Sequence, residues 1–274
     1  MLFFQMVFSS EQESFVLCTM PKSGSYLIEK SLNLLIKKKA YYIPPKHIQR
    51  VFKQEITVPQ LHFFFFHTHY PVPLEFLDNN KLILNIRDLR DVLISYLFFV
   101  SEKESIAYQR KVFDMVDKSI KKRKNFETFV EMVNDEKPVN ERLCFILECA
   151  KDKDQDFLYL TNQFGNVFEI YTLDHPNIFV CRFEDLLSPR GGGDRLKQKE
   201  TLKNVAQFLD VPLSESEADE IAHRLWGGTP TFRNRPGPKV GQWKQYFDDE
   251  IKTAFKEVFG EYLIYFGYEQ DNNW

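Results

Sequence analysis

The chain has 274 residues, of which 43% are hydrophobic and 27% charged, and its formal net charge is −3. This composition supports a buried core in one large or two small soluble domains, and the slight acidic excess argues against general nucleic-acid binding, which needs a basic surface. The cysteines lie in apolar runs without zinc spacing, so we expect reduced core residues of a cytoplasmic protein at Cys18, Cys144, Cys149 and Cys181.

The first eight residues, MLFFQMVF, are apolar and are followed directly by a polar run. They are too short to span a membrane and lack the charged start of a signal peptide. We therefore expect residues 1–14 to form an N-terminal arm, either an extra edge strand or a docking arm, without a membrane anchor.

A strand, a tight loop and a helix are predicted between residues 15 and 36. Phe15–Cys18 is a short apolar run typical of a buried strand, and apolar residues at helical spacing begin at Leu27. In this arrangement the loop N–H groups and the helix N-terminus point at one spot, which favours an anion.

The loop itself reads Pro21-Lys22-Ser23-Gly24-Ser25. Gly24 permits a close backbone approach, Lys22 adds a positive charge, and the two serines add hydroxyl donors. The loop is not a Walker A motif, because the lysine precedes the only glycine. An ordinary strand–turn–helix with a solvated lysine is the alternative.

A second strand is predicted at Leu61–Phe66, where four phenylalanines make the run apolar on both faces, as in a central parallel strand. His69 follows this strand, and ligands of open α/β sheets bind at the carboxyl ends of strands. A histidine there can act as a general base, since its usual pKa lies near neutrality. A histidine that only hydrogen-bonds the loop is the alternative.

A third buried strand, 81–87, ends in Arg87, and Asp88 is a natural N-cap for a helix over 89–100. A guanidinium at a strand end beside a helix N-terminus can bind a phosphate with two parallel hydrogen bonds. Ser95 lies two helical turns further on and can face the same ligand if the helix abuts the site. The alternative is that Arg87 only pairs with one of the aspartates that follow it.

Residues 102–175 are predicted to be mostly helical, with amphipathic helices at 140–151 and 157–171. A strand follows at 177–183. Glu184 and Asp185 follow this strand. They could be interpreted as a pair of catalytic carboxylates, but the pattern favours a capped and salt-bridged strand end. Residues 188–194 predict a flexible surface turn.

Ser214 and Glu217 have the spacing of a capping box at the start of a further helix, which ends near Trp226. The stretch from Thr229 to Phe247 is rich in proline and glycine and predicts a loop.

Four of these blocks resemble, in the same order, motifs of the soluble, cytosolic-type sulfotransferases. The loop at 21–25 is similar to P-K-[ST]-G-[ST], and 68–71 to T-H-x-P. The block at 87–96 is similar to R-[ND]-P-x-D-[VA]-x-x-S, and 241–244 to G-[DQ]-W-K. Together they extend from residue 15 to residue 247.

The resemblance implies one sulfotransferase domain over residues 1–274. Its fold would be a P-loop-like, three-layer α/β/α arrangement in which helices flank a central parallel sheet of about five strands. Residues 102–175 would form the helical region on the acceptor side, and 226–247 the loop that closes over the cofactor.

The resemblance also implies the reaction. The donor would be 3′-phosphoadenosine-5′-phosphosulfate (PAPS), the product 3′-phosphoadenosine-5′-phosphate (PAP), and the acceptor a hydroxyl or amine of a small molecule, with no metal. His69 would be the base, and Lys22 would stabilise charge on the bridging oxygen. The residues expected to bind the cofactor are Lys22, Ser23, Gly24, Ser25, Tyr26, Arg87, Ser95, Phe183, Trp226, either Arg233 or Arg235, and Gly237.

Some positions differ from the family pattern. His67 replaces a lysine, Phe183 replaces a tyrosine that often stacks on adenine, and Tyr26 and Leu27 stand where a hydroxyl residue and a tryptophan are usual. Two alternative functions remain open at this stage: a P-loop-type kinase that uses ATP with Mg²⁺, and a nucleotide-binding protein that has lost catalysis. The expected partners are a small molecule and, as often in this family, a second copy of the chain, with neither nucleic acid nor membrane.

Overall fold

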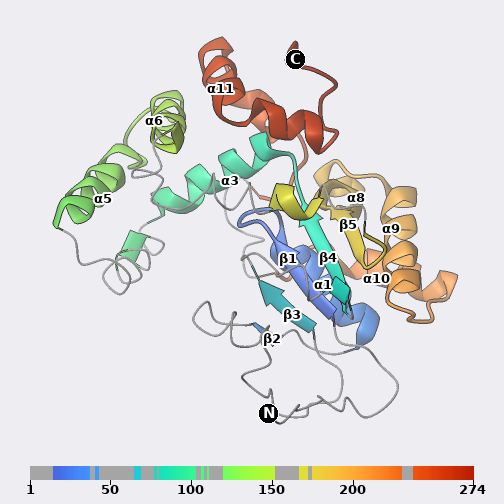
Figure 1. The fold of residues 1–274 in the computed structure, drawn as a ribbon. Coiled ribbons are helices and arrows are strands. Elements are labelled where there is room, and N and C mark those ends of the chain that lie inside the picture. Colours follow the sequence, from blue (N-terminus) through green and yellow to red (C-terminus); the bar gives the residue numbers. More distant parts are fainter. Residues whose placement is uncertain are drawn as a thin grey trace, which may run out of the picture.

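The computed structural model describes residues 15–37, 41–42, 65–68, 77–78, 80–102, 106–107, 110, 120–151, 167–171, 175–229 and 237–274. Within these ranges a parallel sheet has the strand order β2-β3-β1-β4-β5 (Figure 1). Its strands are β1 (Phe15–Thr19), β2 (Tyr41–Tyr42), β3 (Phe65–Thr68), β4 (Lys81–Ile86) and β5 (Ile178–Arg182).

Two hydrophobic cores cover the two faces of this sheet, because side chains alternate along each strand. Val16 and Leu84 belong to the core on one face, and Leu17 and Ile83 to the core on the other. The first core is completed by α3 (Leu89–Ser101), α5 (Ile120–Met132), α6 (Val139–Lys151) and α11 (Asp249–Tyr265). The second is completed by α1 (Ser25–Ile36), α8 (Phe183–Leu186), α9 (Arg195–Phe208) and α10 (Glu215–Arg224). The predicted three-layer α/β/α fold is therefore confirmed.

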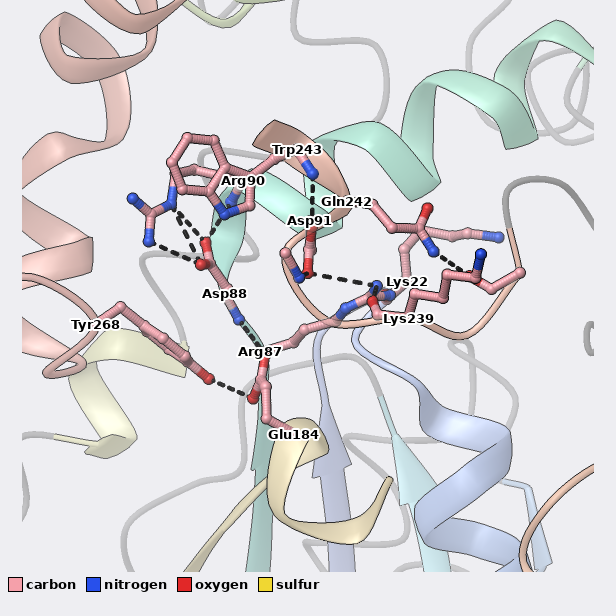
Figure 2. A network of polar contacts seen from close by, with 12 residues as sticks. Lys22, Arg87, Asp88, Arg90, Asp91, Glu184, Lys239, Gln242, Trp243 and Tyr268 are labelled. Carbon is pink, nitrogen blue, oxygen red and sulfur yellow. Dashed lines mark hydrogen bonds and ion pairs between the residues drawn. The ribbon is translucent and has the colours of Figure 1, made fainter. Parts of the chain in front are cut away.

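The order of the strands places their carboxyl ends where a ligand site is expected. The chain leaves β1 through α1 to the strands on one side, and then returns to place β4 on the other side of β1. Such a switch point opens a crevice beyond the carboxyl ends of the central strands. The loop after β1 and the residues after β4 both lie at this edge of the sheet (Figure 2).

Several local predictions are confirmed. Asp88 caps α3 by accepting the Arg90 N–H at 2.9 Å, and Ser214 and Glu217 form the capping box of α10. The four cysteines are free thiols, and all except the half-buried Cys144 are buried.

In the described part of the chain, none of the helices has the length and apolar character needed to cross a membrane.

Other local predictions are wrong in detail. Tyr41 and Tyr42 form a short edge strand, paired with β3, in a stretch where no strand was predicted. The described part of the Phe-rich strand runs through His67 to Thr68, beyond the predicted end at Phe66. The turn after Ser188 contains a short 3₁₀ helix, η2 (Pro189–Gly191), whose last residue is buried rather than on the surface. The predicted arm at residues 1–14 lies outside the described residues.

Candidate functional site

The loop after β1 is held mainly by its own atoms. The Ser23 hydroxyl donates to the Met20 carbonyl at 2.7 Å, and the Ser23 N–H donates to the same oxygen at 3.3 Å. The hydroxyls of Thr19 and Ser25 are 2.8 Å apart. Lys22 and Gly24 both have left-handed backbone conformations, with φ of 66° and 87°. The loop therefore turns sharply twice before α1 begins.

Asn85 of β4 and Phe183, the first residue of α8, fix the loop against the sheet. The buried Asn85 side chain donates from Nδ2 to the carbonyl and to the hydroxyl of Ser23, both at 2.9 Å. The Phe183 ring packs so closely on Gly24 that a Cβ placed there would lie 2.2 Å from a ring carbon. Sequence motifs give no role to Asn85, although a polar residue inside an apolar strand is a signal that could have identified it.

The N-terminus of α1 is available to an anion. Gly24 caps the helix without a side-chain hydrogen bond, and the first turn contains no acidic residue. The first N–H groups of a helix have no partner within the helix and carry a partial positive charge. The loop and the helix therefore offer backbone donors at one place, as the sequence predicts.

Lys22 lies in an apolar part of the site. Its ammonium nitrogen is 4.1 Å from the centre of the Phe99 ring, within the range of a cation–π contact. Burial lowers the pKa of Lys22 to about 8; the Glu102 carboxylate acts in the opposite direction, and the Arg87 charge adds to the lowering. A negatively charged ligand would compensate for both the burial and the repulsion.

Arg87 follows β4 directly and is buried, with 5% of its surface exposed. It donates from Nη1 to the Lys22 carbonyl at 3.1 Å and from Nη2 to the Lys239 carbonyl at 3.2 Å (Figure 2). Its guanidinium carbon is 4.3 Å from the centre of the Phe183 ring, and its Nη2 is 4.0 Å from Asp91. Arg87 therefore joins the loop after β1 to residues near position 240.

One nitrogen of Arg87, the buried Nε, has no hydrogen-bond partner among the described residues. A buried, charged donor without a partner is costly unless a ligand supplies an acceptor. Two cations and a helix N-terminus thus meet at the carboxyl ends of β1 and β4, and this donor set fits a phosphate or sulfonate group.

The residues after Arg87 bind the end of the chain (Figure 2). The Asp88 N–H donates to the Glu184 carboxylate at 2.9 Å, and the Tyr268 hydroxyl donates to the other oxygen of Glu184 at 2.9 Å. Arg90 pairs with Asp88 at 2.8 Å and with Glu269 at 2.5 Å. The Glu184 carboxylate is thus structural, in agreement with the interpretation of a capped strand end.

Arg90 also lies between two indole rings. Its guanidinium carbon is 4.0 Å from the centre of the Trp243 ring and 4.5 Å from that of Trp274. Trp243 belongs to the predicted G-[DQ]-W-K block, and in this structure its ring packs on Arg90.

The segment Gly237–Trp243, called here the closing segment, is tied down at several points. Gln242 donates from its side chain to the Gly237 carbonyl at 2.7 Å, and the Val240 N–H donates to the Gly191 carbonyl at 2.9 Å. The buried Asp91 carboxylate accepts the N–H groups of Gly241 and Trp243 at 2.7 and 3.0 Å. Gly237, expected to bind the cofactor, therefore lies in a segment that is in direct contact with Arg87 through Lys239.

Ser95 is half-buried on α3. It lies four residues from Asp91 and four from Phe99, so the three side chains share one stripe of the helix. Because Asp91 approaches Arg87 and Phe99 contacts Lys22, this stripe faces the loop after β1. The predicted condition for Ser95, that the helix abuts the site, is met.

Tyr26 and Trp226, two aromatic residues expected to bind the cofactor, lie on α1 and after α10. Tyr26 is exposed in the first turn of α1. Lys30, one turn further on, donates to the carbonyls of Arg224 and Gly227 at 2.5 and 2.6 Å and so holds the turn that contains Trp226. Tyr26 and Lys30 share a face of α1, which brings this turn to the same side of the helix.

Phe183 does not offer the stacking surface that the resemblance implies. Only 3% of the residue is exposed, because Arg87 covers its ring face and Gly24 packs on its edge. Phe183 instead supports the loop and the guanidinium. The predicted base His69 and the predicted Arg233 and Arg235 lie outside the described residues.

Sequence motifs miss most of the support around Arg87. They give no role to Asn85, Tyr268, Glu269 and Trp274. Asp91 belongs to the motif at 87–96, but the motif assigns it no partner beyond the alternative of pairing with Arg87. Burial raises the pKa of both Asp91 and Glu184, despite the hydrogen bonds that each accepts from backbone N–H groups. Over the described ranges, no group of three or more His, Cys, Asp or Glu side chains could hold a metal ion.

Comparison with known proteins connects this geometry to one family. The family model for the sulfotransferase domain matches residues 12–226. A mouse sulfotransferase in complex with PAP is similar in structure, with a TM-score of 0.55 and 15% identity over 93% of this chain and 85% of that chain.

Retinol dehydratase is similar in two crystal structures. Its complex with androsterone and the inactive cofactor PAP gives a TM-score of 0.57 and 16% identity over 91% of this chain and 80% of that chain. Its complex with retinol and PAP gives a TM-score of 0.56 and 16% identity over 93% of this chain and 82% of that chain. A search of curated proteins gave no match. At these identities the structural likeness shows the fold.

Proposed function

Because the chain belongs to the sulfotransferase domain family, we propose that it transfers a sulfonate group from PAPS to a hydroxyl or amine of a small molecule. The observation that carries the proposal is the meeting of Lys22, Arg87 and the N-terminus of α1 at one edge of the sheet. The unpartnered Nε of Arg87 supports an anionic ligand there. PAP in the similar structures supports the choice of nucleotide.

The donor supplies an activated sulfonate whose departure leaves negative charge on a phosphate oxygen. In the proposal, Lys22 and the backbone donors at Gly24 and Ser25 stabilise that charge. Arg87 and Ser95 hold the 3′-phosphate, with either Arg233 or Arg235 and Gly237, and so contribute positioning. Tyr26 and Trp226 are the aromatic residues proposed to contact the adenine.

His69 is proposed as the base that removes the proton from the acceptor. In the sequence it comes directly after Thr68, the last residue of β3, and β3 pairs with β1. A base near neutral pKa is suited to a hydroxyl or amine that becomes a nucleophile. This role comes from the family resemblance of residues 68–71.

The acceptor is proposed to be a small molecule. Retinol dehydratase, which shares the fold, is seen with androsterone and with retinol. The family resemblance further supports a cytoplasmic protein that forms a homodimer and needs no metal.

A thermal-shift titration tests the nucleotide. We expect PAP to raise the melting temperature of the wild type in proportion to the logarithm of its concentration above Kd, and to have little effect on Arg87→Ala. Arg110→Ala, which removes an exposed arginine paired with Glu127, is the matched control and should respond as the wild type does. Stabilisation by ATP with Mg²⁺ and not by PAP would instead favour a kinase.

The role of His69 needs a separate measurement. His69→Ala should abolish transfer of labelled sulfonate from PAPS while PAP still stabilises the variant. A variant that retains full turnover would exclude His69 as the base. A wild type that binds PAP but transfers sulfonate to none of a broad acceptor panel would favour a nucleotide-binding protein without catalysis.

A further inference from the structure

Asp91 occupies an unusual position for a carboxylate. It is 1% exposed, lies in the first turn of α3, and both of its oxygens accept backbone N–H groups from the closing segment. Arg87, four residues earlier, lies 4.0 Å from it. A buried carboxylate is costly, so its retention here points to a specific task.

The hydrogen bonds form a continuous path through the site. Asp91 holds Gly241 and Trp243, and the same segment presents the Lys239 carbonyl to Nη2 of Arg87 at 3.2 Å. Nη1 of Arg87 donates to the Lys22 carbonyl at 3.1 Å. With both terminal nitrogens engaged, the guanidinium has one orientation, in which Nε is left without a protein partner.

The hydrogen-bond partners of Asp91 differ from those of a residue that only caps a helix. Asp88 already caps α3 through the Arg90 N–H, so Asp91 is not needed for that purpose. A first-turn carboxylate would favour the helix through its dipole alone, but such a residue is normally exposed. The buried oxygens of Asp91 reach residues 150 and 152 positions away.

We propose that Asp91 is a positioning residue of the nucleotide site: it holds the closing segment against Arg87 and thereby fixes the guanidinium that binds the 3′-phosphate. This inference rests on the proposed function for the identity of the ligand. The tie between Asp91 and the closing segment is independent of it.

Asp91→Asn is the test variant because it keeps the shape of the side chain. The amide has one acceptor oxygen and turns an NH₂ group toward the second N–H, so one tie is lost. We expect the Kd for PAP, measured by titration calorimetry, to rise at least tenfold. The KM for PAPS should rise in parallel, while the KM for the acceptor stays within twofold.

Amide hydrogen exchange tests the contact between Asp91 and the closing segment in the ligand-free protein. The amides of Gly241 and Trp243 should exchange faster in Asp91→Asn than in the wild type. Gln242→Ala removes the hydrogen bond to the Gly237 carbonyl. It should also raise the Kd for PAP and speed the exchange of these two amides, but less than Asp91→Asn does. It serves as the deciding variant if Asp91→Asn does not fold.

Asp248→Ala is the matched control. Its carboxylate also accepts a backbone N–H, from Ile251 at 2.9 Å, but it caps α11, and within the described residues it makes no hydrogen bond or ion pair with the closing segment or Arg87. We expect it to lower the melting temperature and leave the Kd for PAP within twofold of the wild type.

Unchanged PAP affinity in Asp91→Asn would overturn the proposal, as would an equal loss of affinity in Asp248→Ala. If the wild type does not bind PAP, the proposed function fails, and the hydrogen-exchange result then decides the positioning claim alone. Faster exchange at Gly241 and Trp243 would support the tie, and unchanged exchange would refute it.

Discussion

The two halves of the anion site are built in different ways. The loop after β1 is closed largely by contacts between residues three to six positions apart, such as those of Ser23 with Met20 and of Thr19 with Ser25. The segment after β4 is held by partners 65 to 179 positions away, including Lys22, Gly241 and Glu269. A short sequence pattern can specify the first half, whereas the second depends on the assembled fold.

The difference predicts different responses to substitution. In the loop, the Phe183 ring leaves no room for a side chain at Gly24, so a single methyl group there should have a large effect. After β4, several carboxylates and aromatic rings together stabilise the segment, so the substitution of any one of them should have a smaller effect on stability. The three predictions below test this contrast.

The largest expected effect is at Gly24. Gly24→Ala would force an L-residue into a φ of 87° and place its Cβ 2.2 Å from the buried Phe183 ring. Left-handed backbone costs about 1–2 kcal/mol and overpacking about 1–3 kcal/mol, so we expect the free energy of unfolding to fall by about 2–5 kcal/mol. Urea unfolding of the variant measures it.

Phe183→Leu provides the control for this prediction. In the double variant the smaller side chain should relieve the steric part of the cost and leave the backbone part. A loss at Gly24→Ala below about 1 kcal/mol would show that the loop is less constrained than its contacts indicate.

The next largest effect is expected at Glu184. Glu184→Gln would leave one of two donors, the Asp88 N–H or the Tyr268 hydroxyl, without an acceptor, and this should cost about 1–3 kcal/mol of folding free energy. The shared support after β4 predicts that PAP affinity falls less than in Arg87→Ala. Chemical unfolding and PAP titration of the same variant separate the two effects.

The pH dependence of this variant has a definite sign. Burial raises the pKa of Glu184 above its usual 4.5. In the pH window between 4.5 and the raised pKa, the native state therefore retains a proton that the unfolded chain has lost. Wild-type stability should therefore fall as the pH rises through the window, while the Gln variant lacks this contribution. The cost of the substitution should shrink from pH 4.5 upward. Tyr268→Phe removes one of these hydrogen bonds but keeps the titrating group. Because that bond lowers the pKa of Glu184, this variant should still lose stability as the pH rises, and over a wider pH range than the wild type.

The contrast also explains how much the sequence could reveal. The strand–loop–helix at 15–36, the Asp88 cap and the capping box at Ser214 depend on neighbouring residues, and all are confirmed. The α/β fold was predictable for the same reason, since apolar strands alternate with amphipathic helices.

The support around Arg87 could not be predicted in this way. The recognised patterns end at Phe247, yet Tyr268, Glu269 and Trp274 approach Arg90 or Glu184 once α11 packs on the first core. The resemblance gave Phe183 a place beside the adenine, but the ring is buried between Arg87 and Gly24. Such roles follow from long-range packing, which a local motif does not encode.

The smallest predicted effect concerns Lys22 and pH. Because burial lowers its pKa to about 8, the free protein loses the ammonium charge above that pH, while a bound anion would favour the charged form. The fraction of protonated Lys22 falls about tenfold between pH 7 and pH 9, and the affinity for PAP should fall by about the same factor. Calorimetric titrations across this range measure it.

Lys22→Arg separates this effect from general salt or pH effects. An arginine stays charged throughout the range, so its PAP affinity, whatever its absolute value, should change little between pH 7 and pH 9. In the absence of ligand, the sign is reversed: the native wild type binds fewer protons at Lys22 than the unfolded chain between pH 8 and 10.5, so this group adds stability as the pH rises. Equal pH slopes of PAP affinity in the wild type and Lys22→Arg would place the titrating group elsewhere. The loop after β1 would then position the ligand through its backbone donors rather than through the charge of Lys22.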